Sequence, residues 1–176
     1  MDFAATLATV ESFLSARGYR SALVGGVALA AYGLARTTLD LDFVTELAAQ
    51  DGLVGFLEEK GYETLHRSRG YSNHLSADPA LGRLDFIYVD GETAERIFST
   101  SRTLSGPAGE PTRVVSPENL VAMKLLAMKN DPGRELQDLA DLRYLLQLPG
   151  LDRESVRQSF ARHGRLETYD QLLAGL

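Results

Sequence analysis

The sequence predicts an α+β fold. Helical and strand-like patterns alternate from the start of the chain to Asp90, and only helical patterns follow a loop rich in proline and glycine at residues 101–111. The chain has 176 residues, 44% of them hydrophobic, which suffices for an apolar core. We therefore expect a mixed core over residues 1–113 and a helical region over residues 114–176 that packs on it in one compact unit.

The first part of the chain alternates between helical and extended patterns. Apolar residues recur with the period of a helix up to Gly18, and an apolar run then predicts a short strand, which Gly25 and Gly26 interrupt. An alanine-rich helix before Gly33 leads to a second strand, and a further helix ends at Gly61. The expected ranges are helix 3–16, strand 20–24, helix 27–32, strand 39–44 and helix 48–60.

The middle of the chain is less regular than its C-terminal part. Residues 62–75 are polar and show neither the period of a helix nor that of a strand. Residues 83–90 have a clear strand pattern with an acid between apolar neighbours, and Asp90–Gly91 predicts a turn. Ser116 is a suitable helix N-cap with Pro117 in the first helical position. Helices are expected at residues 117–128, 134–146, 152–163 and 166–173.

The composition excludes several kinds of site. The chain has no cysteine, so it lacks disulfides, thiolate nucleophiles and cysteine-bound zinc, and its three histidines are scattered. A formal charge of −6 disfavours broad, sequence-independent binding to nucleic acid, although a local basic patch is compatible with it. No apolar run approaches the roughly 20 residues that span a bilayer, and the start of the chain lacks a basic signal-peptide region. We expect a cytoplasmic protein that does not enter membranes.

Two carboxylates lie shortly after the Gly25–Gly26 pair, separated by one apolar residue. In a strand, successive side chains alternate between faces, so Asp40 and Asp42 point the same way and can hold a divalent cation between them. In a helix, each residue turns by roughly 100°, so the two carboxylates would be about 200° apart. The strand interpretation therefore favours metal-assisted chemistry on a nucleotide.

A third acidic residue, Asp85, lies within the later apolar strand pattern. Transfer of a nucleotidyl group needs one cation that binds the triphosphate and a second that activates the attacking hydroxyl, and Mg²⁺ or Mn²⁺ suits such oxygen ligands. We expect Asp40, Asp42 and Asp85 to be the metal ligands and catalytic residues, with Asp85 also receiving the acceptor proton. Gly25–Gly26 would let phosphate oxygens approach backbone N–H groups, and Lys124 would balance charge on the leaving pyrophosphate.

At these residues the chain resembles the AbiEii-like branch of the DNA polymerase β-type nucleotidyltransferase superfamily. Residues 36–42, Arg-Thr-Thr-Leu-Asp-Leu-Asp, match the family's first motif, in which a small-residue pair and a helix precede Arg-x-Thr-x-Asp-x-Asp. Residues 84–87, Leu-Asp-Phe-Ile, resemble its third motif, an acid within an apolar strand. Residues 124–127, Lys-Leu-Leu-Ala, and 138–142, Asp-Leu-Ala-Asp-Leu, resemble its fourth. The resemblance covers about residues 20–146.

The resemblance implies a nucleotidyltransferase core, a short mixed β-sheet flanked by helices, with a C-terminal helical region that closes over the nucleotide. It also implies transfer of a nucleoside monophosphate from an NTP to an acceptor hydroxyl, with release of pyrophosphate. The candidate acceptors are tRNA, a protein or a small molecule, and a cognate antitoxin is a candidate partner in a toxin–antitoxin or phage-defence system. The nucleotide-binding residues that the resemblance suggests are Gly25, Gly26, Arg36, Thr38, Lys124 and Asp138.

Two parts of the family pattern are missing. Its second motif, Lys-x-Ser, has no clear copy, and Gln137 replaces the basic residue before the last Asp-x-x-Asp. One alternative is therefore a nucleotide- or partner-binding pseudoenzyme of the same fold, which would bind NTP without releasing pyrophosphate. Another is a small-molecule nucleotidyltransferase of the aminoglycoside type, which shares the carboxylates.

Several candidate residues also have a purely structural interpretation. Thr38 fits support of a neighbouring carboxylate by packing or hydrogen bonding better than contact with substrate, and Arg36 fits an ion pair with a strand carboxylate equally well. Asp85 fits an edge-strand acid paired with Arg83. Lys124 fits a lysine that extends from an apolar face to water, and the spacing of Asp138 from the arginine four residues before it fits an exposed salt bridge.

Overall fold

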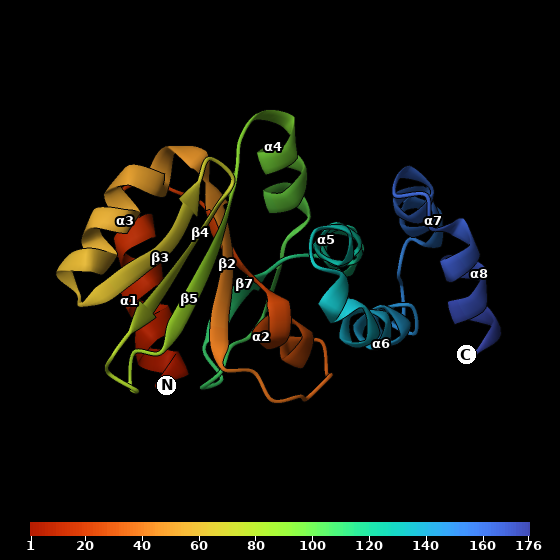
Figure 1. The fold of residues 1–176 in the computed structure, drawn as a ribbon, viewed down its shortest axis with the longest axis horizontal. Helices are drawn as coiled ribbons and strands as arrows, with labels where there is room; N and C mark the ends of the chain where they lie inside the picture. Colours follow the sequence, from red (N-terminus) through yellow and green to blue (C-terminus); the bar gives the residue numbers. More distant parts are fainter. The chain divides into compact units, whose positions relative to one another are not determined.

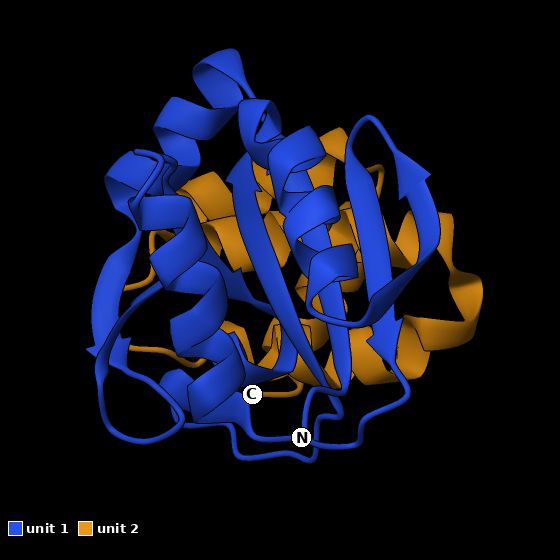
Figure 2. Cartoon of the chain, turned by 90° about the vertical axis from the view of Figure 1, so that its left-hand side faces the viewer, with its two compact units in different colours: residues 1–115 blue, residues 116–176 orange.

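The computed structural model describes residues 1–176. The chain divides into two compact units, residues 1–115 (unit 1) and residues 116–176 (unit 2), which Figure 2 shows in different colours. Unit 1 contains a mixed seven-stranded β-sheet with helices, and unit 2 is helical throughout. The α+β fold predicted from the sequence is therefore confirmed.

One β-sheet organises unit 1. Its strands are β1 Ser21–Val24, β2 Asp40–Glu46, β3 Tyr62–Ser68, β4 Tyr71–Ser76, β5 Arg83–Val89, β6 Arg102–Ser105 and β7 Pro111–Val114. They follow the order β3-β4-β5-β2-β1-β7-β6. The pairs β2–β5 and β1–β7 are parallel, and all other neighbours are antiparallel. The sheet is thus mixed, with β2 and β5 away from both edges.

Helices flank this sheet. They are α1 Phe3–Ser15, α2 Gly25–Ala31, α3 Gln50–Glu59 and α4 Gly91–Thr100. Figure 1 shows α1 and α3 on the same side of the sheet, where the rings of Phe13 and Phe56 stack with centroids 4.2 Å apart. Leu84 and Phe86 of β5 are fully buried, and Leu84 faces α1 and α3. Because side chains alternate along a strand, Asp85 points to the other face.

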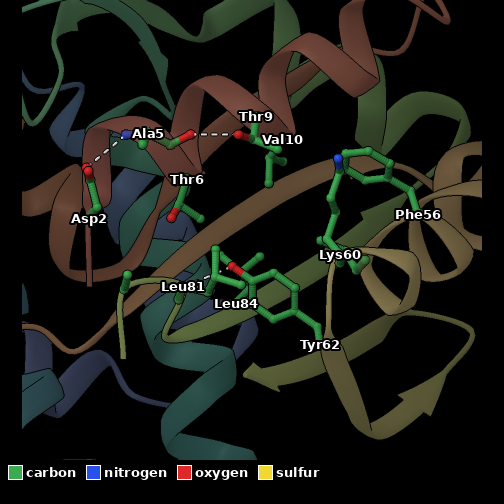
Figure 3. Close-up of a pocket in the computed structure, with 12 residues that line it drawn as sticks. Asp2, Ala5, Thr6, Thr9, Val10, Phe56, Lys60, Tyr62, Leu81 and Leu84 are labelled. Carbon is green, nitrogen blue, oxygen red and sulfur yellow. Dashed lines mark hydrogen bonds between the residues drawn. The ribbon is translucent and has the colours of Figure 1, made fainter. Parts of the chain in front are cut away.

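A small cavity of about 270 Å³ lies between α1, α3 and the chain around β5. In Figure 3, Val10, Leu81 and Leu84 line it, and the hydroxyl of Tyr62 donates a 3.0 Å hydrogen bond to the backbone carbonyl of Leu81. The cavity lies on the side of β5 opposite to Asp85. It is therefore separate from the acidic residues that the sequence singles out.

Three regions of unit 1 differ from the sequence-based expectation. Residues 62–75, which fit neither period, form most of the antiparallel pair β3–β4. Residues 101–111, expected to be a loop, contain β6 and the start of β7, because the turn between these two short strands holds Gly106, Pro107 and Gly109, and Pro111 begins β7. Asp90–Gly91 begins helix α4 instead of forming a turn, with Asp90 as the N-cap residue.

Unit 2 consists of helices that agree closely with the predicted ranges. They are α5 Pro117–Asn130, α6 Glu135–Leu145, α7 Arg153–Arg162 and α8 Leu166–Ala174. Ser116 caps α5 as expected, because its hydroxyl accepts a hydrogen bond from the backbone N–H of Asn119 at 3.4 Å. Fully buried apolar side chains on these helices include Leu125, Leu142 and Phe160. None of the chain's helices has the length and apolar character needed to cross a membrane.

Candidate active site

Three carboxylates converge on the face of the sheet opposite to α1 and α3. Asp40 and Asp42 lie two residues apart on β2, and Asp85 lies on the parallel neighbour β5. The register of these strands pairs Asp42 with Asp85. One carboxylate oxygen of each residue lies within 4.8 Å of those of the other two. We call Asp40, Asp42 and Asp85 the carboxylate cluster.

The loop before β2 supports this cluster. The hydroxyl of Thr38 donates a 2.6 Å hydrogen bond to Oδ1 of Asp40, which is the supporting contact that its position in the sequence suggests. Arg36 lies in the same loop, half-buried, and its Nη1 donates to the carbonyl oxygen of Thr37 at 3.4 Å. The first part of the family motif therefore lies next to one of the acids.

The glycine pair begins helix α2 and lies against the same residues. Gly25 has a φ of +64°, in the left-handed region, and a Cβ at this position would overlap the carboxylate of Asp42. A Cβ at Gly26 would lie 2.6 Å from the hydroxyl oxygen of Thr38. Any larger residue at either position would therefore collide with Asp42 or Thr38.

Asp85 is the buried member of the cluster. Burial raises the pKa of its carboxyl group above the ordinary value, the adjacent Arg83 opposes this effect, and the charge of Asp40 adds to it. Nε of Arg83 lies 3.0 Å from Oδ1 of Asp85. The pairing with Arg83 is therefore present, but the edge-strand interpretation of Asp85 is wrong, because β5 lies between β4 and β2.

Two further residues, neither of which was assigned to the site from the sequence, approach the cluster from β4. Asn73 is paired with Asp85 in the strand register, and its Oδ1 is buried without a hydrogen-bond partner. Tyr71 interacts with Arg83 and Asp85, and burial together with the charge of Asp85 raises the pKa of its hydroxyl to about 12. Alternation of Tyr71 and Asn73 with the buried residues between and after them is the signal that could have revealed this strand.

In unit 2, Lys124 forms a buried ionic group with two acids of α6. Its Nζ lies 2.6 Å from Oδ1 of Asp138 and 2.6 Å from Oδ2 of Asp141. Asp138 is 0% exposed and Asp141 is 2% exposed, so the interpretation as an exposed salt bridge is wrong. Lys124 does not extend to water either, being 6% exposed. Arg134 lies nearby, with Nε 3.9 Å from the second oxygen of Asp138, which has no hydrogen-bond partner.

On the side of the sheet that faces α1 and α3, a chain of hydrogen bonds runs through His74. Its Nε2 lies 2.8 Å from the hydroxyl of Ser72, which lies 2.8 Å from the hydroxyl of Tyr88. Its Nδ1 lies 3.1 Å from the hydroxyl of Thr64, which donates to Glu58 at 2.8 Å. Because Thr64 uses its hydrogen for Glu58, Nδ1 of neutral His74 is the donor and Nε2 the acceptor. Burial lowers the pKa of His74, which is not part of the cluster.

The fold defines the class of protein. The solution structure of the antibiotic-resistance factor ANT(2'')-Ia is similar with a TM-score of 0.60 and 18% identity, over 99% of this chain and 92% of that chain. Lincomycin-bound lincosamide antibiotic adenylyltransferase LnuA is similar with a TM-score of 0.55 and 16% identity, over 81% of this chain and 96% of that chain. A putative nucleotidyltransferase (TM1012) from Thermotoga maritima has a TM-score of 0.55 and 11% identity, over 79% and 92%. The chain therefore shares the fold of these proteins.

A family model places the chain more narrowly. Residues 11–175 match the family described as nucleotidyl transferase AbiEii toxin, Type IV TA system. The chain therefore belongs to the AbiEii nucleotidyltransferase family, as the motifs indicate. No curated protein matches the chain in sequence.

Proposed function

We propose that this protein transfers a nucleoside monophosphate from an NTP to an acceptor hydroxyl and releases pyrophosphate. The observation that carries the proposal is the convergence of Asp40, Asp42 and Asp85 within 4.8 Å, in a member of a nucleotidyltransferase family. Three carboxylates this close repel one another, and surface solubility alone does not require such an arrangement. A ligand of opposite charge relieves that repulsion.

The donor atoms of the carboxylate cluster suit Mg²⁺ or Mn²⁺. All three are carboxylate oxygens, the ligands that hard divalent cations prefer, and they project from two adjacent strands onto one face. When bound, such cations neutralise the triphosphate and lower the pKa of the attacking hydroxyl. We therefore assign Asp40 and Asp42 to both cations and Asp85 to the cation on the acceptor side.

The remaining roles follow from position and charge. The acceptor oxygen attacks the α-phosphorus, the bond to the bridging oxygen of the β-phosphate breaks, and pyrophosphate leaves. Asp85 takes the acceptor proton, because it is the carboxylate on the acceptor side. The backbone at Gly25 and Gly26 lies beside Asp42 and Thr38. Phosphate oxygens held by the cations would therefore lie close to the backbone N–H groups of the glycine pair.

Arg36, Lys124 and Asp138 complete the proposed nucleotide-binding residues. Arg36 supplies a guanidinium in the loop before β2 and suits a phosphate group. Lys124 and Asp138 contribute as a pair, since Nζ of Lys124 lies 2.6 Å from Oδ1 of Asp138.

Several classes of acceptor carry a suitable hydroxyl group. ANT(2'')-Ia is an antibiotic-resistance factor and LnuA is a lincosamide antibiotic adenylyltransferase, whereas the AbiEii family is described as a toxin of a Type IV toxin–antitoxin system. We therefore retain tRNA, a protein and a small molecule as acceptor classes, and an antitoxin as partner. The pseudoenzyme alternative predicts NTP binding without pyrophosphate release.

One experiment tests the activity and the acceptor class together. Each α-labelled NTP is incubated with the protein and Mg²⁺ or Mn²⁺, in the presence of total RNA, total protein or a panel of hydroxylated small molecules. Label that enters one acceptor class, and that is lost in the Asp40→Ala/Asp42→Ala variant, supports the transferase and identifies the class. NTP binding with no label in any class favours the pseudoenzyme instead.

A further inference from the structure

Arg83 forms an ion pair with one member of the carboxylate cluster. Arg83 and Asp85 are two residues apart on β5, so their side chains lie on the same face of the sheet. Nε of Arg83 lies 3.0 Å from Oδ1 of Asp85. The register of β2 and β5 pairs Arg83 with Asp40 and Asp85 with Asp42. A positively charged side chain is therefore present beside two of the three carboxylates.

The two partners of this ion pair differ in their exposure. The side chain of Arg83 is 42% exposed, whereas that of Asp85 is 12% exposed. The guanidinium can therefore turn towards solvent while the carboxylate stays in place. Tyr71 interacts with both side chains, so Asp85 retains a polar neighbour when Arg83 leaves.

We propose that Arg83 is the counter-ion of the carboxylate cluster and competes with divalent cations for Asp85 when no nucleotide is bound. The three carboxylates carry three negative charges, and Arg83 neutralises one of them. It also repels a cation held at the same carboxylates. This inference rests on the proposed function, because that function places the cation at Asp40, Asp42 and Asp85.

Nucleotide binding removes the competition. An NTP brings phosphate oxygens to the cluster, and a guanidinium binds phosphate in the same two-pronged way as carboxylate. The half-exposed Arg83 can therefore exchange Asp85 for a phosphate, which frees Oδ1 of Asp85 for the cation. Arg83 thus makes tight cation binding depend on the presence of the nucleotide.

Manganese binding to the nucleotide-free protein tests this inference without measuring activity. Free Mn²⁺ is quantified by electron paramagnetic resonance during titration of the wild-type protein and of Arg83→Gln, Arg83→Lys and Arg102→Gln. We expect Arg83→Gln to bind Mn²⁺ roughly tenfold more tightly, because the repulsion and the competition are both removed. Arg83→Lys keeps the charge and should stay within about twofold of the wild type.

Arg102→Gln is the matched control for the loss of one positive charge. Arg102 is exposed on β6, four positions from β5 in the sheet, or about 19 Å at ordinary strand spacing. That distance exceeds the Debye length of about 8 Å at physiological ionic strength, so its removal should leave the Mn²⁺ affinity unchanged. Thermal melting of each variant shows whether it is folded.

Each outcome bears on one of the two proposals. Equal Mn²⁺ affinity in the wild type and Arg83→Gln overturns the counter-ion role, and weaker binding in Arg83→Gln overturns it too, because Arg83 would then only hold Asp85 in place. Absence of Mn²⁺ binding in both the wild type and Arg83→Gln contradicts the metal site itself. Loss of binding in Asp40→Asn confirms that the titrated site is the carboxylate cluster.

Discussion

Thr38 donates a 2.6 Å hydrogen bond to Asp40 and at the same time lies against Gly26, where a Cβ would come within 2.6 Å of its hydroxyl oxygen. This relationship connects the glycine pair at the start of α2 with the acids of β2. The glycine pair and the segment with Thr38 and Asp40 therefore pack against each other, and the position of each depends on the other.

Thr38→Val should reduce activity with little effect on stability. Valine keeps the shape of threonine but removes the hydrogen bond that orients Asp40. Loss of a group that orients a metal ligand typically costs about 10- to 100-fold in activity or metal affinity. Steady-state nucleotidyl transfer measures the loss, with Thr37→Val, at the exposed neighbouring position, as the control. Equal activity in both variants would show that the hydrogen bond has no role.

Gly25→Ala should lower stability and Mn²⁺ affinity by more than the strain of a Cβ at positive φ alone would. A residue with a Cβ at positive φ costs about 1–2 kcal/mol, and here the Cβ would also overlap the carboxylate of Asp42. Gly18 has a φ of +75° and no atom near its would-be Cβ, so Gly18→Ala isolates the backbone effect. Urea unfolding and Mn²⁺ titration compare the two. If both lower stability equally and neither changes Mn²⁺ affinity, the close approach of Gly25 to Asp42 is unimportant.

Strands β1, β2 and β5 of unit 1 could be predicted from the sequence because they are strongly apolar, whereas the other four strands could not. The sequences of β2 and β5 are apolar with acids between the apolar residues, a clear strand pattern. The alternation along β2 correctly indicates that Asp40 and Asp42 share a face of the sheet. The pairing of Asp42 with Asp85 could not be read from local patterns, since it depends on which strands become neighbours. Asn73 was missed for the same reason, because its neighbour lies on another strand.

Lys124→Met should strongly destabilise unit 2. It would leave the buried carboxylates of Asp138 and Asp141 without their cation, and breaking a buried ion pair costs about 3–5 kcal/mol. Lys129→Met, an exposed position on the same helix, is the control. Urea unfolding monitored by circular dichroism measures both. A loss no larger than in Lys129→Met would mean that the buried group contributes little.

This buried group also shows where sequence reasoning fails. The sequence spacing of Arg134, Asp138 and Asp141 is that of an exposed salt bridge, and nothing local distinguishes it from a buried one. The distinguishing contact comes from Lys124 on the preceding helix. Burial of polar side chains is decided by the packing of whole helices, which the pattern of one helix does not contain.

Stability should decrease as the solution becomes acidic, in part through His74. Burial, with the charge of Arg67 adding to it and that of Glu58 opposing it, lowers the folded-state pKa of His74 below its ordinary value of 6.5. Neutral His74 therefore contributes stability that is fully present above pH 6.5 and is lost as the pH falls through the folded-state pKa.

The free energy of unfolding in urea, measured from about pH 7.5 down to about pH 5.5, tests this dependence. We expect a smaller decrease in His74→Gln than in the wild type, whereas His66→Gln, at an exposed position, should keep the wild-type slope. A slope in His74→Gln equal to that of the wild type would assign the pH dependence to other groups.

The central claim is that the carboxylate cluster carries nucleotidyl transfer. Release of labelled pyrophosphate from γ-labelled NTP, in the presence of Mg²⁺ and the acceptor class that takes up α-label, tests it most directly when each acid is changed singly to asparagine. Asp40→Asn, Asp42→Asn and Asp85→Asn should each abolish release, whereas Asp51→Asn, at a side chain that is 91% exposed on α3, should not. Release that persists in any one of the three cluster variants at the level of Asp51→Asn would contradict the claim.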